Sequence, residues 1–553
     1  THFRDALLTN LVEPLDLEIQ AYRPVVVYIN GEYWGIHNLR EKLTEHYLEA
    51  NGKANPDKVD LMKHRNDLQH GNRTQYKALI KFLSKTDLSD TTKVYELAQQ
   101  MDIDNFIDYN ITQIFIDNRD AGGNIRYWKP QNNDSKWRWI LFDTDMSFGI
   151  SDWKGYKTNT LKKMTSRNTE AWPNPAWSTF IVRKLLENDS LKHVYINRFS
   201  DHLNTIFTTG NVLFKLDSIK SMLNEEMPYH VTKWRSNNLK RWERNVGILR
   251  DFANYRPTYM RQFLMEQFEL TDTLVVEVIP TDKRMGKVYL NSLKIKQPFK
   301  GYYFKEVPIR LKAKPNFGYE FIEWKGIHKT SKTLDYSLSK NIEIEPIFKQ
   351  KDASQWKQKV ILNELCLKSD SSNLMKDWVE IYNNSDTTID ISNWELIIEK
   401  EYLKISKNVI LQPNQYYVIA RQPNLLNKYS NISDILLPRG LPSKKGFIAL
   451  LDNKSAVVDS FSYNVKKNFK TDTILLPIIL EKVNPNQFSN VANWNINNQP
   501  TIGERNRAFK EYKPIKVNLI AQYWKLLLGV VAGLSLFLLI ILSLRRKKLK
   551  KTE

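Results

Sequence analysis

Cysteine is almost absent from this 553-residue sequence: Cys366 is the only one, so no disulfide can form within the chain. The domains must therefore be stabilised by their hydrophobic cores, even in an oxidising compartment. The nine histidines show no metal-binding spacing, and no Gly-x-Ser-x-Gly or Cys–His pattern occurs. The sequence thus offers no zinc site and no familiar serine or cysteine nucleophile.

Acidic residues are also in short supply. The chain has 61 Asp and Glu against 82 Lys and Arg, a formal charge of +21. Six positive charges fall in residues 545–551, and the others are scattered, mainly as lysine. A dispersed lysine excess is more typical of a solvated surface than of a nucleic-acid groove, so no nucleic-acid partner is expected. Acidic envelope polymers are the partners that such a surface would favour.

Long apolar runs are rare, and one stands out. Residues 526–544 are 19 consecutive positions without a charge, preceded by Tyr523 and Trp524 and followed by the basic residues 545–553. At about 1.5 Å per residue, such a helix roughly spans a bilayer core of about 30 Å. We therefore predict a C-terminal transmembrane helix at 526–544, a cytoplasmic tail at 545–553 and N-terminal domains outside the cytoplasm. A buried core helix is the alternative.

The rest of the chain is long enough for several cores, and its patterning changes along the sequence. Residues 1–268 mix helical and strand spacing. Residues 273–350 and 356–507 show short alternating strands, which predicts two all-β modules.

Within the first region, local patterns place individual elements. Residues 25–29 and 33–36 are predicted to form a hairpin joined at Asn30-Gly31. Residues 40–50 and 105–117 have helical spacing. The strands predicted at 125–128 and 137–142 are expected to pair.

Two aspartate clusters flank this strand pair. Asp120 and Asn124 precede strand 125–128, and Asp143 and Asp145 follow strand 137–142. Phosphoryl transfer needs one carboxylate to orient the attacking hydroxyl. Other oxygen ligands then hold the Mg²⁺ that neutralises the phosphates. Taken without other signals, turn and capping aspartates are the more ordinary interpretation.

A third motif makes the first region specific. Residues 24–41 read Pro-Val-Val-Val-Tyr-Ile-Asn-Gly-Glu-Tyr-Trp-Gly-Ile-His-Asn-Leu-Arg-Glu, and residues 139–149 read Trp-Ile-Leu-Phe-Asp-Thr-Asp-Met-Ser-Phe-Gly. With Asp-Ala-Gly-Gly-Asn at 120–124 between them, these motifs resemble those of spore-coat-protein-H-like (CotH) kinases. The resemblance implies an atypical, protein-kinase-like α+β domain. It also implies transfer of phosphate from ATP, with Mg²⁺ or Mn²⁺, to Ser or Thr of secreted or surface proteins.

The resemblance also implies a site. Asp120 would be the catalytic aspartate, and Asn124, Asp143 and Asp145 would be metal ligands. Arg40 and Glu41 would face the nucleotide. For Glu41, an ordinary carboxylate at a helix N-terminus is an equal alternative. A His-Arg-Asn-Asp stretch at 64–67 imitates a kinase motif but lacks the metal-binding asparagine, and is predicted to be a loop. Because the family's domain extends upstream of this sequence, the domain is expected to be N-terminally truncated, without its nucleotide-anchoring basic residue.

The β modules carry resemblances of their own. Residues 315–326 and the strands around them are similar to a single internalin-type B repeat. Residues 361–364, 377–383 and 501–506 resemble the motifs of a lamin-tail domain, an immunoglobulin-like sandwich. The predicted fold class is therefore multidomain: a truncated α+β kinase-like domain, a small all-β repeat module, an all-β lamin-tail sandwich and one transmembrane helix.

Two functions of different classes fit these expectations. One is a membrane-anchored extracytoplasmic kinase whose β modules act as spacers or bind envelope polymers. The other is a non-catalytic surface adhesion or scaffold protein with a degenerate kinase-like domain. The joint presence of Asp120, Asn124, Asp143 and Asp145 favours the enzyme, although fold alone does not settle function.

Overall fold

A computed structural model provides the structure of the chain. The residues it describes are 2–132, 134–167, 172, 174–234, 238–368, 377–421, 432–437, 439–469 and 477–509. The chain divides into two compact units, Thr1–Gln350 and Lys351–Glu553. Each unit has its own hydrophobic cores.

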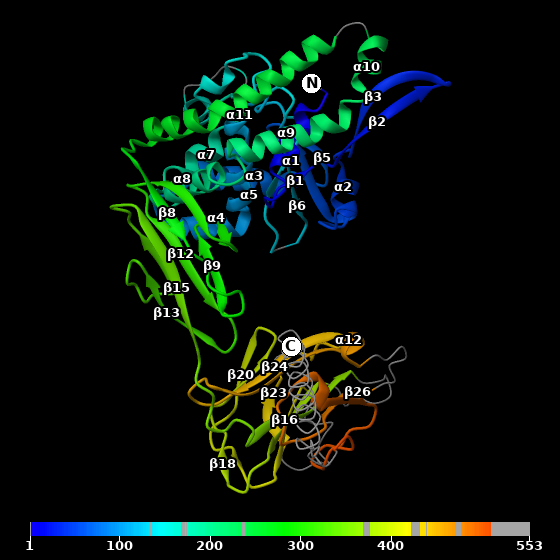
Figure 1. Cartoon of the computed structure of the whole chain (residues 1–553), viewed down its shortest axis with the longest axis vertical. Coiled ribbons are helices and arrows are strands. Elements are labelled where there is room, and N and C mark those ends of the chain that lie inside the picture. Colours follow the sequence, from blue (N-terminus) through cyan, green and yellow to red (C-terminus); the bar gives the residue numbers. More distant parts are fainter. Residues whose placement is uncertain are drawn as a thin grey trace, which may run out of the picture. The chain divides into compact units, whose positions relative to one another are not determined.

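The first unit opens with helices packed around a five-stranded sheet (Figure 1). The elements before the sheet's last strand are α1 (Arg4–Leu11), β1 (Glu18–Ile19), β2 (Tyr22–Ile29), β3 (Glu32–Arg40), α2 (Glu45–Ala50), β4 (Val59–Lys63), β5 (Asp67–His70), α3 (Thr74–Lys85), α4 (Thr91–Gln100), α5 (Ile103–Phe115), β6 (Arg126–Pro130) and β7 (Arg138–Leu141), with a 3-10 turn at Pro56–Lys58. The elements after it are a 3-10 turn at Gly155–Lys157, α6 (Thr160–Thr165), α7 (Phe180–Leu185), α8 (Asp189–Leu203), α9 (Thr209–Leu223), α10 (Met227–Lys233) and α11 (Leu239–Phe268). The strand order is β1-β7-β6-β4-β5, with only β1 and β7 parallel.

Helix α5 lies in the centre of this region. Asp102 caps its N-terminus by accepting a hydrogen bond from the Asn105 amide, and every residue from Asn105 to Phe115 is buried. A helix buried on all sides is held rigidly, so the loop that follows it is anchored at its start. The predicted helix at 105–117 is confirmed, ending two residues earlier. The predicted pairing of strands 125–128 and 137–142 is also confirmed, with Tyr127 opposite Trp139.

The predicted hairpin is confirmed as β2 and β3, which pair antiparallel. Asn30 and Gly31 have φ of 51° and 83°, the left-handed geometry that a two-residue hairpin turn requires. The helix predicted from residue 40 is wrong at its start. The strand ladder continues to Arg40, which pairs with Tyr22, and α2 begins only at Glu45.

A buried guanidinium holds the end of α5. Arg256, on α11, is fully buried and donates hydrogen bonds to the carbonyl oxygens of Ile114 and Phe115, in the last turn of α5. It also donates to the carbonyl oxygens of Tyr156 and Thr158. The last carbonyls of a helix have no partner within the helix, and Arg256 supplies the donor for the Phe115 carbonyl. The Ile114 carbonyl also accepts the Asp117 amide, at 3.2 Å, so Arg256 gives it a second donor.

A small β module completes the first unit. Its strands are β8 (Thr273–Val278), β9 (Gly286–Leu290), β10 (Leu293–Ile295), β11 (Phe299–Phe304), β12 (Ile309–Pro315), β13 (Tyr319–Lys325), β14 (Thr333–Tyr336) and β15 (Ile342–Gln350). They form two four-stranded sheets, β10-β9-β12-β14 and β11-β8-β15-β13. The module docks on α8 through the buried Asp201, which accepts hydrogen bonds from the Ser292 hydroxyl and from Tyr303.

The second unit is a β-sandwich. Its elements are β16 (Val360–Lys368), β17 (Trp378–Asn383), β18 (Ile389–Asp390), β19 (Glu395–Ile398), β20 (Glu401–Lys404), β21 (Ile410–Leu411), β22 (Tyr416–Ala420), β23 (Ile432–Leu436), β24 (Lys445–Leu451), β25 (Val457–Asn464), α12 (Val465–Phe469), β26 (Ile478–Lys482) and β27 (Trp494–Asn497), with a 3-10 turn at Val491–Asn493. A six-stranded sheet, β23-β22-β17-β16-β26-β27, and a four-stranded sheet, β20-β19-β24-β25, enclose the core.

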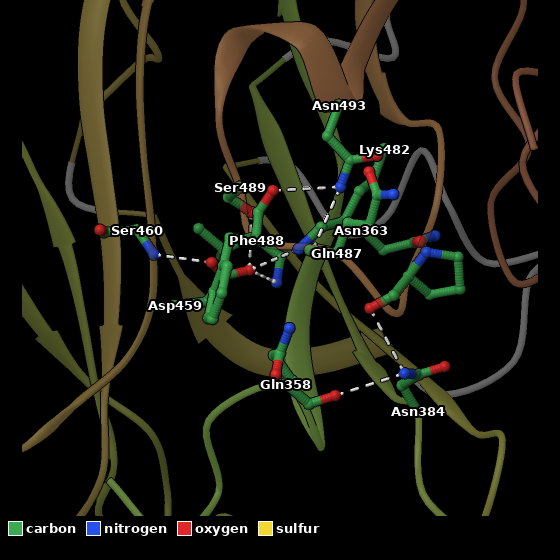
Figure 2. A network of polar contacts seen from close by, with 12 residues as sticks. Gln358, Asn363, Asn384, Asp459, Ser460, Lys482, Gln487, Phe488, Ser489 and Asn493 are labelled. Carbon is green, nitrogen blue, oxygen red and sulfur yellow. Dashed lines mark hydrogen bonds and ion pairs between the residues drawn. The ribbon is translucent and has the colours of Figure 1, made fainter. Parts of the chain in front are cut away.

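A polar network joins the two sheets (Figure 2). Asp459 on β25 accepts hydrogen bonds from the Leu362 amide of β16, at 3.0 Å, and from the Ser489 hydroxyl, at 2.9 Å. It also forms an ion pair at 2.9 Å with Lys482, whose side chain is only 1% exposed. Because the buried lysine and the buried carboxylate neutralise each other, the sandwich tolerates both.

Three buried glutamates lie side by side on the larger sheet. Glu364 on β16 is opposite Glu380 on β17 and Glu481 on β26, and all three are fully buried. Their oxygens accept hydrogen bonds from the amides of Thr501, Gly503 and Ala508. Burial raises the pKa of all three, that of Glu380 to about 7. The glutamates thus fasten residues 501–508 across the sheet.

The predicted membrane helix requires a correction. Within the described ranges, no helix combines the length and the apolar character needed to cross a bilayer. The 30-residue α11 is long enough, but charges such as Arg244, Asp251 and Arg256 interrupt it. The transmembrane component of the fold class and the single-pass localisation are therefore not upheld. Residues 526–544 and 545–553, to which they were assigned, lie outside the described residues.

The role of Arg256 can be tested by Arg256→Met. The variant removes the donors of the Phe115 and Tyr156 carbonyls and one of the two donors of the Ile114 carbonyl. We therefore expect the free energy of unfolding of the first unit to fall by about 3 kcal/mol or more. Arg250→Met on the same helix removes an exposed pair with Asp217 and should cost less than about 1 kcal/mol. Urea denaturation measures both. Equal, small losses would contradict the assigned role.

The glutamate row predicts a pH dependence for the second unit. A folded pKa above the unfolded value means that the folded state binds more protons. The contribution of Glu380 is therefore fully present below its ordinary pKa of 4.5 and is lost as pH rises through about 7, by up to about 3 kcal/mol. Hydrogen exchange of the β16 and β17 amides should accelerate between pH 5 and pH 8 beyond the intrinsic rate. Glu380→Gln should reduce that excess, and an unchanged excess would refute the account.

Candidate functional site

The first half of the candidate site is the turn that follows α5. Asp117 reverses the chain with a φ of 52°. The Asp120 amide donates to the side chain of the buried Asn118, at 2.9 Å, and the Asp120 carbonyl accepts from the Asn124 amide, at 3.0 Å. The Asn124 side chain then donates to the Asp120 carboxylate at 2.7 Å. Asp120 and Asn124 are thus held as one constellation.

The second half follows β7. Asp143 has a φ of 51°, so the chain turns sharply after the strand. Two backbone hydrogen bonds tie this loop to the first one: the Arg119 amide donates to the Met146 carbonyl, and the Phe148 amide to the Ile116 carbonyl, both at 2.9 Å. The Asn124 side chain also reaches the Asp143 carbonyl, at 3.3 Å. The two aspartate clusters of the sequence therefore meet in space.

The carboxylates in this site repel one another. Burial raises the pKa of Asp143, and the nearby charges of Asp145, Asp5 and Asp120 raise it further. Burial also raises the pKa of Asp120, against the hydrogen bond from Asn124, and the charge of Asp145 adds to the increase. Such a cluster of negative charge is stabilised by a cation.

Helix α1, with Arg4 and Asp5, and the end of β3, with Arg40, supply charged groups beside this cluster. Asp5 accepts hydrogen bonds from the amide and the hydroxyl of Thr144, at 2.8 and 2.7 Å, and forms an ion pair with Arg40 at 2.6 Å. Burial lowers the pKa of Arg4 to about 10, while the charge of Asp145 opposes that shift. The side chains of Arg4 and Arg40 thus lie on the same side of the molecule as the two clusters.

Both guanidinium groups have hydrogen-bond donors to spare. Nε of Arg4, and Nε and Nη2 of Arg40, are buried and have no hydrogen-bond partner among the described residues. Buried donors without partners are rare, because each costs roughly 1–3 kcal/mol. Their presence here indicates a place where an external acceptor would bind. Phosphate oxygens match guanidinium donors well.

Glu41 is not part of this constellation. Its carboxylate accepts hydrogen bonds from the Ala21 amide, at 2.8 Å, and from the Asn51 side chain, at 3.1 Å. It lines a separate cavity of about 580 Å³. The prediction that Glu41 begins a helix is wrong. Its carboxylate holds the chain before β2 and, within the described residues, makes no hydrogen bond to either aspartate cluster.

Two other parts of the sequence near the site are Asp117 and the stretch 64–67. Asp117 is buried and is bound by Arg119, at 2.8 Å, and by the Thr160 hydroxyl. It therefore stabilises the turn after α5. Of the loop predicted at 64–67, residues 64–66 are confirmed as a turn, and Asp67 begins β5. His64 nevertheless lies close enough to Asp120 to lower its pKa slightly.

The residues present fit a magnesium-bound phosphate group. Asn124, Asp143 and Asp145 offer the oxygen ligands that Mg²⁺ or Mn²⁺ prefers, and Arg4 and Arg40 offer donors for phosphate. In the described part of the chain, no three His, Cys, Asp or Glu side chains already form a metal cage. The fit rests on the guanidinium donors of Arg4 and Arg40 that lack partners among the described residues, and on the mutual repulsion of the carboxylates.

Sequence reasoning missed Arg4 and Asp5. They lie more than 100 residues before the first aspartate cluster, on a helix of eight residues with ordinary composition. The only signal was a charged pair next to apolar positions, which surface helices commonly carry. Their role becomes visible only when α1 is seen beside Thr144.

Comparisons with known proteins agree with these observations. The family model described as CotH kinase protein matches residues 1–260, and the model described as Lamin Tail Domain matches residues 353–465. No curated protein matches the chain.

Among solved structures, the crystal structure of a DUF4876 family protein from Bacteroides thetaiotaomicron VPI-5482 is 9% identical. The match covers 38% of this chain and 86% of that chain, with a TM-score of 0.16. So low a score supports no conclusion about this fold. The resemblance of residues 273–350 to an internalin-type B repeat stays a prediction.

From the two family models, residues 1–260 are a CotH kinase domain, and residues 353–465 are a lamin tail domain.

Proposed function

We propose that the CotH kinase domain transfers the γ-phosphate of ATP to a Ser or Thr hydroxyl of a secreted or surface protein. The observation that carries this proposal is that carboxylates and guanidinium groups, each needing a partner of opposite charge, lie close together. Carboxylates that repel one another lie beside guanidinium groups that keep buried donors without partners among the described residues. A magnesium-bound triphosphate would satisfy both sets of groups, since it offers positive charge to one and oxygen acceptors to the other.

Asp120 is the residue proposed to orient the attacking hydroxyl and to accept its proton. Its carboxylate is fixed by Asn124, at 2.7 Å, and Asp120 is only half-buried, so it stays accessible to substrate. A pKa raised by burial makes it a better proton acceptor than an ordinary aspartate. Positioning and electrostatic stabilisation supply most of the acceleration in phosphoryl transfer, so this rigidity matters.

Asn124, Asp143 and Asp145 are proposed to hold Mg²⁺ or Mn²⁺. The bound metal would neutralise phosphate oxygens of ATP. Arg40 would contact phosphate while Asp5 keeps its guanidinium in place, and Arg4 would add a second group of donors. Glu41 has no proposed role in the chemistry.

The competing function is a non-catalytic adhesion or scaffold protein with a degenerate kinase-like domain. A scaffold has no use for buried, unpartnered guanidinium donors beside repelling carboxylates, and these cost stability. That cost favours catalysis. The decisive test is incubation of the protein with labelled ATP and Mg²⁺ or Mn²⁺, followed by detection of autophosphorylation.

Substitutions at the two halves of the site should act differently. Asp120→Ala should lower the phosphorylation rate by about 10²-fold or more, because it removes the proton acceptor, while nucleotide binding persists. Asp143→Ala should weaken metal-dependent ATP binding as well. Glu41→Gln serves as the matched control and should retain activity. Labelled-phosphate incorporation and calorimetric ATP titration separate these effects. Full activity in Asp120→Ala would refute the assignment.

The pKa shifts predict an acid limb in the activity profile. Asp120 and Asp143 must be ionised to act, and their pKa values are raised, so activity should fall as pH decreases while ordinary aspartates are still ionised. Asp145→Asn removes a charge that raises both pKa values. The acid limb of the remaining activity should therefore move to lower pH. A limb that stays in place or moves to higher pH would contradict the electrostatic account.

A further inference from the structure

An open groove of about 770 Å³ on the second unit is lined by positive side chains that the kinase chemistry does not use. They come from the β19–β20 turn, from the segment before β24, from the start of β24 and from α12. These cations are Lys400, Arg439, Lys445 and Lys467. All four are exposed. The lining contains one carboxylate, Glu399. A concave surface of this size can hold a short segment of another molecule.

The floor of the groove follows from the register of β24 and β25. Gly446 is opposite Tyr463, and Lys445 is opposite Asn464. The Tyr463 ring lies against Gly446, where a Cβ atom would come within 2.4 Å of the Tyr463 hydroxyl. The hydroxyl is fixed by the carbonyl of Pro442, at 2.8 Å. Gly446 thus makes room for the buried Tyr463 ring, and the exposed Lys445 is its neighbour along β24.

The positive charges of the groove are not compensated nearby. None of the four cations forms an ion pair with any residue that the structure describes. Glu399 is engaged elsewhere: its carboxylate accepts the Phe447 amide at 2.8 Å, and its own amide donates to the Phe447 carbonyl at 2.9 Å. The exposed Lys444 and Lys466 add charge beside the groove. Like charges gathered in a concavity favour an anionic ligand.

We propose that this groove binds phosphorylated segments of protein. A phosphoserine or phosphothreonine carries a charge of about −1.5 to −2 and three acceptor oxygens, which suit a group of lysines with one arginine. The proposal rests on the proposed function, because the CotH kinase domain of the same chain would produce such segments. Single-stranded nucleic acid is disfavoured, since neither aromatic residue of the lining offers an open ring for stacking with bases. Tyr463 is only 4% exposed, and the half-buried Phe447 packs against the cluster that contains Ala449.

The test uses the whole chain and a fluorescein-labelled synthetic peptide that carries two phosphoserines. Its unphosphorylated form is the comparison. Fluorescence anisotropy should show binding of the phosphopeptide at least about tenfold tighter, and weaker binding at higher salt. Lys445→Glu/Lys467→Glu should reduce the affinity about tenfold or more. Lys407→Glu/Lys454→Glu, which changes exposed lysines of the same unit outside the groove lining, is the matched control and should bind normally.

Several results would overturn the proposal. These are equal binding of both peptides, full binding by the groove variant, and equal loss in the control variant. Tighter binding of inorganic polyphosphate than of the phosphopeptide, with the same sensitivity to Lys445→Glu/Lys467→Glu, would assign the groove to a phosphate polymer instead. If circular dichroism shows that the double variant is unfolded, Lys400→Ala/Arg439→Ala replaces it, with a loss again expected.

The same assay separates this proposal from the kinase function. The phosphate groups are introduced by chemical synthesis, so binding needs no catalysis. Asp120→Ala should therefore bind the phosphopeptide as tightly as the unaltered chain. Failure to bind leaves the kinase proposal unaffected, and failure of autophosphorylation leaves the binding result unaffected.

Discussion

The guanidinium of Arg256 is the contact on which the candidate site depends. It is fully buried, and it binds the last carbonyls of α5 together with the carbonyls of Tyr156 and Thr158. Helix α5 leads into the turn that carries Asp120, and the 155–160 segment follows the loop that carries Asp143. One side chain on α11 therefore holds the chain just before the Asp120 turn and just after the Asp143 loop. Helix ends need such partners, and here the partner sets the positions of the functional loops.

In front of these loops, the site is built from groups that are individually unfavourable. Asp143 and Asp120 are pushed toward protonation by burial and by neighbouring carboxylates. Arg4 and Arg40 keep buried donors without partners. Folded proteins usually pair such groups internally, and they leave them unpaired where a ligand completes the set. The groove of the second unit likewise collects charged groups without partners, since its lysines form no ion pairs with the described residues.

Much of this site could be predicted from sequence because its chemistry is local. Asp120 and Asn124 are four residues apart, Asp143 and Asp145 are two apart, and the strands between the clusters pair through a short turn. Arg4, Asp5 and Thr144 could not be found in this way, since α1 reaches the site only through tertiary packing. The helix predicted to begin at residues 40–41 was misplaced because the hairpin ladder runs to Arg40 and α2 begins only at Glu45. The Glu41 side chain is held by Ala21 and Asn51.

Fold prediction shows the same division. Period-two patterns and turn residues were enough to place the hairpin and both β modules, since these signals are written in adjacent residues. The row of Glu364, Glu380 and Glu481 depends on strand neighbours far apart in sequence, so only the structure reveals it. The membrane prediction rested on a charge-free run with its aromatic and basic flanks, and no helix in the described ranges of the chain supports it.

The central claim is that the aspartate loops and the guanidinium groups together form a site for a metal-bound triphosphate. Titration of Mn²⁺ into the protein, followed by electron paramagnetic resonance of free Mn²⁺, tests this claim directly. With protein and ATP together, the account predicts a lower concentration of free Mn²⁺ than with ATP alone. Asp143→Ala should abolish this difference. Uptake identical to that of ATP alone, or unchanged in Asp143→Ala, would contradict it.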